Sequence, residues 1–306
     1  MMQVVLLTEE QYENLNPPNE DWYIDNLLNE DQLVLEALER RGVTVKKVGW
    51  SHPNFDWHQA HAAVFRTTWD YYHRFAEFDS WLRTWEDQLK FINPGSLIRW
   101  NLDKHYLKDL ERAGIRITPT HIIEAGSTTT LAELHGQLGW EETILKPAIS
   151  GAARHTYRLN RSNLLAHEDI FQELISNEAM LLQPFQYEIL TSGEVSHVVI
   201  GGRYTHSVLK KAKQGDFRVQ DDFGGTVQDY TPSRMEISFA EQAVAACPSM
   251  PAYARVDVLR DNDGEWAIGE LEMIEPELWF RRNPSAADAL AEVIFRNLEQ
   301  SDSKGD

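Results

Sequence analysis

The chain has 306 residues, of which 42% are hydrophobic, and a formal net charge of −19. That apolar content is enough for the cores of two or three packed units, and the acidic balance argues against nucleic acid as a partner. The single cysteine, Cys247, excludes an internal disulfide and favours a reducing compartment. Because we find no signal peptide and no apolar run near the ~18 residues of a membrane helix, we expect a cytoplasmic protein without membrane contact.

Helix and strand signals alternate along the chain, which predicts an α/β or α+β fold. The stretch "VVLL" (4–7) reads as a buried strand, a helix is expected over 31–41 with Gly42 as its stop signal, and "VTVKKV" and "AAVF" follow as strands. This βαβ start predicts a small parallel-sheet domain over residues 1–96. The loop "NPPNEDW" (16–22) is long enough to be functional.

Two further units, 97–180 and 181–306, mix helices with strands. The expected helices cover 103–113, 131–138, 238–246 and 286–298. The second unit also holds the strand-like "IRITPTHII" and a strand, loop and strand in "ETILKPAISGAARHTYRL". The third unit contains two expected antiparallel hairpins, the first of which turns at Gly201-Gly202.

The second hairpin leads into "IGELEMIEPELWF" (268–280), which places four glutamates within eight positions of an otherwise apolar stretch. Asp263-Gly264 is a strong signal for a two-residue hairpin loop. Such a loop would pair Asp257 with Glu270, and Arg255 with Glu272, so that all four side chains share one face. A loop with an odd residue count would destroy this arrangement.

Three carboxylates on one face need a positive partner. Oxygen ligands of this kind suit Mg²⁺, which commonly takes a few carboxylates together with substrate phosphates. A solvated polar face balanced by Arg255 explains the pattern equally well, so the hairpin alone leaves both interpretations open.

Lysines that could hold a nucleotide occur outside any P-loop or Rossmann fingerprint, since neither motif is present. Lys146 ends the strand in "TILKPAISGAA", and the small-residue loop after it can bring backbone N–H groups close to phosphates. Lys104 stands in the first turn of its expected helix, where the helix dipole favours an anion. Pro184 interrupts the strand in "MLLQPFQ" and could leave backbone groups free for an adenine edge. The alternatives are ordinary surface lysines and a plain linker.

Taken in chain order, six stretches resemble the motifs of the ATP-grasp superfamily: "NLDKHYLKDLERAGIRITPT", "TILKPAISGAA", "LLQPFQYEI", "LKKAKQGDFRVQDDFGGT", "ARVDVL" and "IGELEMIEP". The resemblance runs from Asn93 to the C-terminus, behind an N-terminal domain of the kind that the family usually carries. It implies an ATP-grasp fold, in which a central lid domain and a C-terminal domain, both α+β, clamp ATP between them.

The resemblance also implies a set of ATP-binding residues: Lys104, Lys146, Ser150, Gly151, Ala152, Gln183, Phe185 and Glu188. The lysines would contact phosphates, the Ser150 loop would close over them, and Gln183 and Phe185 would meet the adenine. Glu194 competes with Glu188 for the ribose. Asp257, Glu270 and Glu272 match the family's Mg²⁺ ligands, although many members have E-x-N where this chain has Glu270-Leu-Glu272.

Within the superfamily, "LKKAKQGDFRVQDDFGGT" is similar to the branch of glutathione synthetase and ribosomal protein S6 ligase, and the chain also resembles the ligase that forms D-cycloserine. The branch has R-x-N where this chain has Arg218-Val-Gln220. The implied reaction is attack of a carboxylate on ATP to give an acyl phosphate, which an amine then opens. Lys210, Arg218 and Arg255, with two Mg²⁺ ions that Mn²⁺ could replace, would neutralise the phosphate charge.

On the substrate side, "FRTTWDYYHRF" follows a predicted strand at the end where open α/β sheets bind ligands. Arg66 could hold a carboxylate and Asp70 an ammonium group of a small amino-acid-like or peptide substrate, with Trp69 beside them. An aromatic cluster that packs under the next helix is the alternative. Further candidate substrate contacts are Gln220 and Arg281.

Three main hypotheses of function stay open at this point, with a kinase that phosphorylates a hydroxyl group as a minor fourth. The first is an ATP-dependent ligase that joins a carboxylate to an amine, and the second is a cyclising ligase of the D-cycloserine type that acts on one substrate. The third is a nucleotide-binding protein without turnover, against which the carboxylate trio and the lysines argue. The family resemblance also allows a homodimer.

Overall fold

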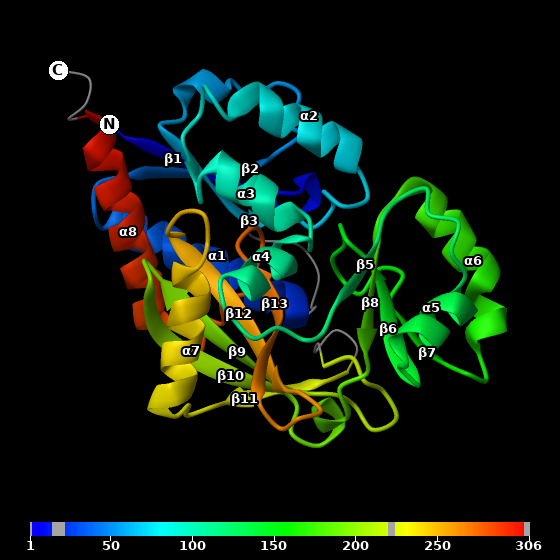
Figure 1. Ribbon diagram of the computed structural model, residues 1–306. Coiled ribbons are helices and arrows are strands. Elements are labelled where there is room, and N and C mark those ends of the chain that lie inside the picture. Colours follow the sequence, from blue (N-terminus) through cyan, green and yellow to red (C-terminus); the bar gives the residue numbers. More distant parts are fainter. Residues whose placement is uncertain (1, 14–21, 220–223, 303–306) are drawn as a thin grey trace.

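The computed structural model describes residues 2–13, 22–219 and 224–302, and these form three β-sheets flanked by helices (Figure 1). The N-terminal sheet has the strand order β2-β1-β3-β4. Its strands are β1 (Gln3–Thr8), β2 (Thr44–Gly49), β3 (Ala62–Thr67) and β4 (Phe91–Ile92). All of its pairings are parallel, which confirms the predicted βαβ start. Residues 16–21 of the loop expected over 16–22 lie outside the described residues, and Trp22 begins the first helix.

The helices of this region are α1 (Trp22–Glu39) and α2 (Phe75–Trp85), with short 3-10 turns η1 (Glu10–Tyr12) and η2 (Trp57–Gln59). Helix α1 begins nine residues before the predicted start at Asp31. The sequence pattern hides this first half because two of the residues on its buried face, Glu30 and Asp31, are acids. The C-terminal helix α8 (Pro284–Asp302) packs along α1 around a shared apolar core.

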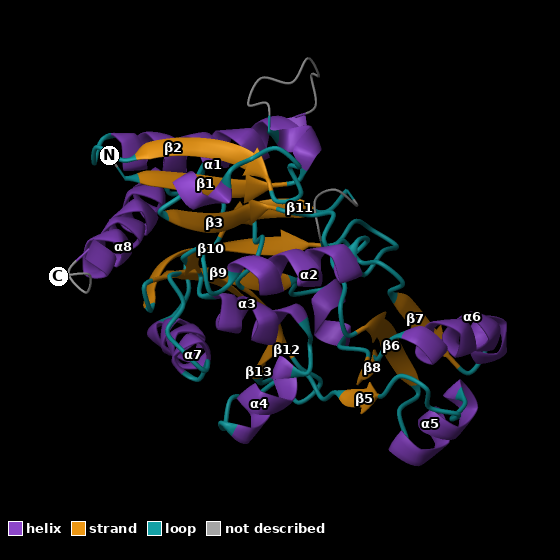
Figure 2. Cartoon of the chain, turned by 90° about the horizontal axis from the view of Figure 1, so that it is seen from above, coloured by secondary structure: helices purple, strands orange, loops and turns teal. Residues whose placement is uncertain are grey.

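The central sheet, β5-β8-β6-β7, stands apart as a small lobe with α5 (Leu131–Leu138) and α6 (Leu164–Asn177) against it (Figure 2). Its strands are β5 (His121–Ile123), β6 (Glu142–Pro147), β7 (Tyr157–Asn160) and β8 (Met180–Pro184). The expected domain boundary at residue 180 falls on the first residue of β8, which pairs with β6. The division of the chain into three domains stays a prediction.

The third sheet has the order β11-β10-β9-β12-β13. Its elements are β9 (Glu194–Ile200), β10 (Arg203–Lys211), β11 (Thr226–Asp229), β12 (Tyr253–Arg260) and β13 (Trp266–Glu272), with η3 (Tyr187–Leu190) before it and α7 (Arg234–Ala245) against it. Ile200 pairs with Arg203, so the predicted turn at Gly201-Gly202 is confirmed. A mixed α/β fold of one parallel sheet and two antiparallel sheets is therefore present, as expected.

The outer edge of β13 is covered by residues that precede the central lobe, chiefly α3 (Gly95–Leu102) and α4 (Tyr106–Arg112). The Asn101 side chain donates to the Leu271 carbonyl (2.8 Å) and accepts from the Met273 N–H (2.9 Å). The Tyr106 hydroxyl accepts from the Leu271 N–H (2.9 Å). Because an edge strand otherwise leaves these groups unpaired, side chains fix the backbone on either side of Glu272.

The carboxylate hairpin reaches the predicted pairing by a different route. Asp261 and Glu265 close a three-residue loop, so the two-residue loop predicted at Asp263-Gly264 is wrong. The register then shifts at Gly269, which stays unpaired as a β-bulge, because Val258 faces Ile268 while Asp257 faces Glu270. The odd loop and the one-residue bulge cancel, and Asp257 and Arg255 face Glu270 and Glu272 as predicted.

Arg66 lies in a buried ion-pair network, and its predicted role as a substrate contact is wrong. Its side chain, 2% exposed, pairs with Glu30 (2.5 Å) and Asp31 (3.0 Å) of α1. Asp31 also pairs with Lys47 (2.6 Å), and Glu30 accepts the backbone N–H groups of Leu278 and Phe280. The strand pattern placed Arg66 at the correct sheet edge, but the acids on α1 neutralise it there.

Among the helices of the described chain, none combines the length and apolar character that a membrane span requires.

We predict that Arg66→Met lowers the free energy of unfolding by about 3–5 kcal/mol, because the buried carboxylate of Glu30 loses the cation that pairs with it. Urea titration followed by circular dichroism measures this change. Arg83→Met is the matched control, since it removes an arginine whose ion pair with Asp79 lies at the surface, and it should leave the unfolding midpoint unchanged. Equal stability of the two variants would show that the network contributes nothing.

Candidate active site

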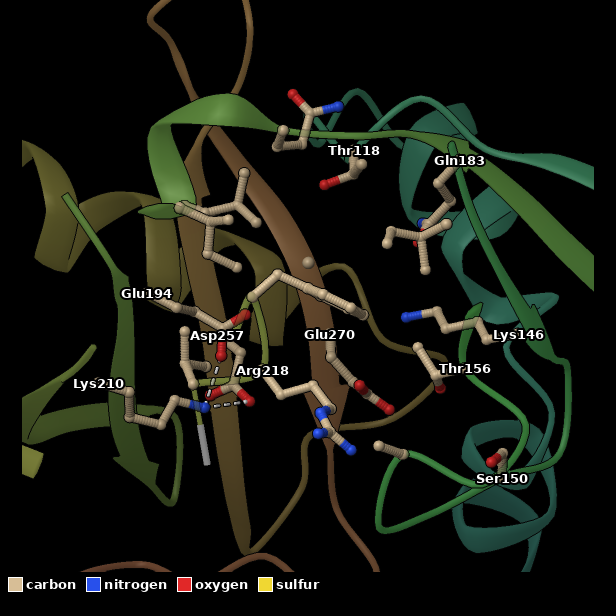
Figure 3. Close-up of a pocket in the computed structure, with 18 of the residues that line it drawn as sticks. Thr118, Lys146, Ser150, Thr156, Gln183, Glu194, Lys210, Arg218, Asp257 and Glu270 are labelled. Atoms are coloured by element: carbon tan, nitrogen blue, oxygen red, sulfur yellow. Dashed lines mark hydrogen bonds and ion pairs between the residues drawn. The ribbon is translucent and has the colours of Figure 1, made fainter. Parts of the chain in front are cut away.

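A cavity lies between the central lobe and the third sheet, with β6, β8 and the loop after β6 on one side and β9, β10, β12 and β13 on the other. Figure 3 shows Lys146, Ser150 and Thr156 on one side, Lys210, Asp257 and Glu194 on the other, and Glu270 between them. Of the predicted site residues, those that line this cavity are Lys104, Lys146, Ser150, Gly151, Ala152, Gln183, Phe185, Lys210, Arg218, Arg255, Asp257, Glu270 and Glu272.

The charge of this lining differs from that of the whole protein. Its cations are Lys104, Lys146, Lys210, Arg218 and Arg255, and its carboxylates are Glu194, Asp257, Glu270 and Glu272. Five cationic groups thus face four carboxylates in a chain whose formal net charge is −19. A concave surface with this local excess of positive charge attracts an anionic ligand.

Two lysines, Lys104 and Lys146, lie near Glu270 in the cavity. Lys104 donates to the Ser150 carbonyl (2.7 Å) and pairs with Glu270 (3.1 Å). Lys146, at the end of β6, forms no ion pair with a side chain in the described part of the chain. Burial lowers the pKa of Lys146, against the attraction of Glu270. An ammonium group in this position is stabilised by an anion that enters the cavity.

The loop after β6 has an unusual backbone. Ala152 and Ala153 adopt left-handed conformations, with φ of 47° and 53°. Such angles cost free energy for residues other than glycine, and they occur where the surroundings impose them. A Cβ atom at Gly151 would lie 2.6 Å from the Tyr72 ring, so only glycine allows the loop to approach the N-terminal domain this closely.

The carboxylates of the hairpin are held by cations in this structure. Asp257 accepts from Arg255 (2.9 Å), Lys210 (3.2 Å) and the Ser196 hydroxyl (2.5 Å). Burial opposes the ionisation of Asp257, but Arg255 and Lys210 outweigh it and hold its pKa below the ordinary value. Lys210 also pairs with Glu194 (2.5 Å).

Glu272 is less well compensated, although Arg255 pairs with it. Burial, together with repulsion from Asp257 and Glu270, raises its pKa to about 7. Within the described ranges no three His, Cys, Asp or Glu side chains converge as a ready ligand set for a metal ion. The donor chemistry nevertheless suits Mg²⁺, because all the groups are carboxylate oxygens and a bound cation would favour the ionised form of Glu272.

The other end of the cavity is apolar. It is lined by Ile144, Phe185, Ile189, Phe217, Val219 and Leu259. The Arg158 guanidinium lies 3.8 Å from the centre of the Phe185 ring, and the Phe217 ring meets the Phe185 ring edge to face at 6.1 Å between ring centres. A slot of this kind accepts a flat aromatic base. Gln183 at its edge donates to the Thr120 hydroxyl (2.8 Å).

Several predicted residues lie elsewhere. Glu188 is outside the cavity, where its carboxylate accepts from the Thr191 and Ser192 hydroxyls, whereas its competitor Glu194 lines the cavity. Asp70 accepts from Trp50 (2.7 Å) and Arg74 (2.8 Å) and lines neither this cavity nor the adjoining one.

One more predicted substrate contact, Arg281, also falls outside this cavity. Arg281 pairs with Glu277 and faces a shallow surface hollow, while Gln220 lies outside the described residues. Trp69, by contrast, lines the second cavity, which adjoins the first.

Sequence reasoning missed Trp279. It is 2% exposed and has a left-handed backbone, with φ of 48°. Glu30 fixes this turn by accepting the N–H groups of the residues on both sides. The Trp279 ring centre lies 5.2 Å from the Arg255 guanidinium and 5.8 Å from the Lys210 amine, which places both cations against one aromatic surface. Its place after Pro276 carries no local pattern that reveals this contact.

Comparisons with known proteins agree with this geometry. Residues 4–93 match the family model described as the N-terminal domain of D-cycloserine synthetase DcsG. The chain is 28% identical over 285 residues to the cycloserine biosynthesis protein DcsG of Streptomyces lavendulae, a match that covers 87% of this chain and 93% of the relative.

Solved structures give the same result for the fold. The crystal structure of D-cycloserine synthetase DcsG is similar with a TM-score of 0.83 and 26% identity, covering 96% of this chain and 99% of the other. The D-alanine–D-alanine ligase of Bacillus anthracis, complexed with ATP, matches with a TM-score of 0.66 and 12% identity over the whole of both chains.

The ATP-grasp ligase PsnB matches with a TM-score of 0.62 and 17% identity, covering 95% of this chain and 99% of the other. The predicted ATP-grasp fold is thus confirmed. With a cationic cavity between its two antiparallel sheets and these similarities along nearly all of its length, the chain is an ATP-grasp ligase of the class that forms carbon–nitrogen bonds, similar to D-cycloserine synthetase.

Proposed function

We propose that the chain activates a small carboxylate substrate with ATP, through an acyl phosphate, and forms an amide-type C–N bond with release of ADP and phosphate. The observation that carries this proposal is the cationic lining of the first cavity in a strongly acidic protein. Its apolar end has room for adenine, and its five cations lie beyond that end, where the phosphates would follow.

In this arrangement Lys104 and Lys146 bind the ATP phosphates, and the Ser150–Ala152 loop covers them. Asp257, Glu270 and Glu272 would hold Mg²⁺, two ions in our proposal with Mn²⁺ as a substitute, and the metal supplies charge neutralisation at the phosphates. Binding of phosphates would draw Lys104 from Glu270, which frees that carboxylate.

The chemical step needs charge compensation more than a nucleophilic side chain. A carboxylate oxygen of the substrate attacks the γ-phosphorus while the bond to ADP breaks, and Lys210, Arg218 and Arg255 stabilise the charge on the transferred group. The amine then attacks the acyl carbon and phosphate leaves. The loop over the cavity excludes water, which would hydrolyse the acyl phosphate.

A cyclising reaction on one amino-acid-like substrate is the second candidate. It is favoured by the similarity to D-cycloserine synthetase over 96% of the chain. The two candidates share the activation step and differ in the origin of the amine, which is a second molecule in the first case and the same molecule in the second.

We expect Glu270→Gln to reduce ATP turnover by on the order of 100-fold or more, because the cavity loses a charged oxygen ligand at the phosphates. Release of ADP in the presence of the substrate measures the loss, and thermal unfolding should stay near that of the unmodified protein. Asp263→Asn, at the exposed tip of the same hairpin, is the control and should keep full turnover. Full activity of Glu270→Gln would show that Glu270 is not a ligand of the metal.

A thermal-shift screen of amino acids and dipeptides, with Mg²⁺ and a non-hydrolysable ATP analogue, identifies the substrate, because a ligand of the native state raises the melting temperature.

We expect that substrate labelled with ¹⁸O in its carboxylate transfers one ¹⁸O atom to the phosphate product. Mass spectrometry of phosphate measures this transfer. Phosphate without label would exclude the acyl phosphate, and the mass of the organic product separates joined molecules from a ring.

A further inference from the structure

The second cavity continues the first beyond the phosphate end. The two share Lys104, Lys210, Arg255, Glu270, Glu272 and the loop of residues 150–152. A molecule in the second cavity would therefore reach the transferred phosphoryl group directly. This adjacency makes the second cavity the place for the substrate that ATP activates, as the proposed function requires.

The second cavity is electrically polarised. Its cationic side chains within the described residues, Lys104, Lys210 and Arg255, all lie in the part shared with the first cavity. The part that it does not share contains two carboxylates, Glu275 and Glu277. A ligand with a negative group toward ATP and a positive group at the other end fits this distribution.

Of the two acids, Glu277 is paired with Arg281. Glu275 forms no ion pair with a described side chain, and its hydrogen-bond partner is the Tyr71 hydroxyl. Burial, with repulsion from Glu272, raises the pKa of Glu275 to about 8. A cation placed beside Glu275 would remove the cost of ionising it there.

Aromatic rings form the wall next to Glu275. The Trp69 indole N–H donates to the Glu275 carbonyl (3.1 Å), which fixes the ring beside this residue. Tyr23 stacks on Trp69 at 6.1 Å between ring centres, and Tyr12 meets its edge at 6.0 Å. All three rings line the cavity. Aromatic faces together with a carboxylate are the combination that binds an ammonium group.

We propose that Glu275 and the wall of Tyr12, Tyr23 and Trp69 bind the ammonium group of the substrate and thereby orient its carboxylate toward Lys104, Lys210 and Arg255. This inference rests on the proposed function for the position of the carboxylate. Glu275 takes the role that the sequence assigned to Asp70. The enzyme then selects substrates with a free amino group and rejects those in which it is acylated or replaced by a hydroxyl.

Glu275→Gln tests the proposal, since it removes the charge and keeps the size of the side chain. The probes are three amines, D-alanine, D-serine and D-cycloserine, and the hydroxy acid D-lactate, titrated calorimetrically into protein with Mg²⁺ and AMPPNP. We expect the unmodified protein to prefer the amines to D-lactate. In Glu275→Gln the affinity for the amines should fall at least about tenfold, with D-lactate unchanged.

Glu265→Gln, at the exposed tip of the β12–β13 hairpin, is the matched control and should bind the amines normally. AMPPNP should bind Glu275→Gln as it binds the unmodified protein, which also shows that the variant is folded. The proposal is overturned if Glu275→Gln keeps its affinity for the amines, or if the unmodified protein binds none of them. A different result would contradict the proposed function itself: AMPPNP would then fail to bind even to the unmodified protein.

Discussion

The site depends on the register of β12 against β13. Asp257 faces Glu270 and Arg255 faces Glu272 because the bulge at Gly269 compensates for a three-residue loop. A slip by one residue would turn the carboxylates of β13 toward the apolar core, where Leu271 and Met273 now lie. Burial of the apolar face of β13 therefore fixes the register that brings the carboxylates together on the opposite face. Gly269 itself lines the cavity, and a Cβ atom there would lie 3.4 Å from a carboxylate oxygen of Glu194.

The same strand ties the parts of the molecule together. Asn93, which follows β4, donates to the carbonyls of Met273, just after β13, and of Tyr253, the first residue of β12. It also accepts from the Ala252 N–H. These bonds join the N-terminal sheet to the third sheet. The Tyr253 hydroxyl donates to the Phe65 and Ile274 carbonyls. Each of these buried bonds is costly to lose. These bonds fix the strands that floor both cavities to the N-terminal sheet.

Much of the charge inside the cavity is already paired before any ligand enters. Lys210 and Arg255 neutralise Asp257, and Lys104 neutralises Glu270, so the buried acids and bases stabilise one another. A nucleoside triphosphate with the two Mg²⁺ ions proposed above has little net charge, so it can exchange these partners with little change of buried charge. The arrangement explains how an acidic protein can hold an anionic ligand, because its negative surface and its cationic cavity lie in different places.

The amino-acid sequence by itself determined the order of the strands and helices in broad outline, the α/β class, and the residue types of the cavity. These features can be predicted from the alternation of apolar and polar residues and from the order of the motifs, because both depend on residues that are close in the sequence. Helix α6 was missed, and so was the first half of α1, where acids stand on the buried face and disguise the apolar pattern. Only the tertiary structure decided the partners of buried charges. Arg66 is neutralised by acids 35 and 36 positions away, and Glu275 meets Trp69 across 206 positions. No local pattern records a contact over such a separation, because it exists only once the sheets have packed.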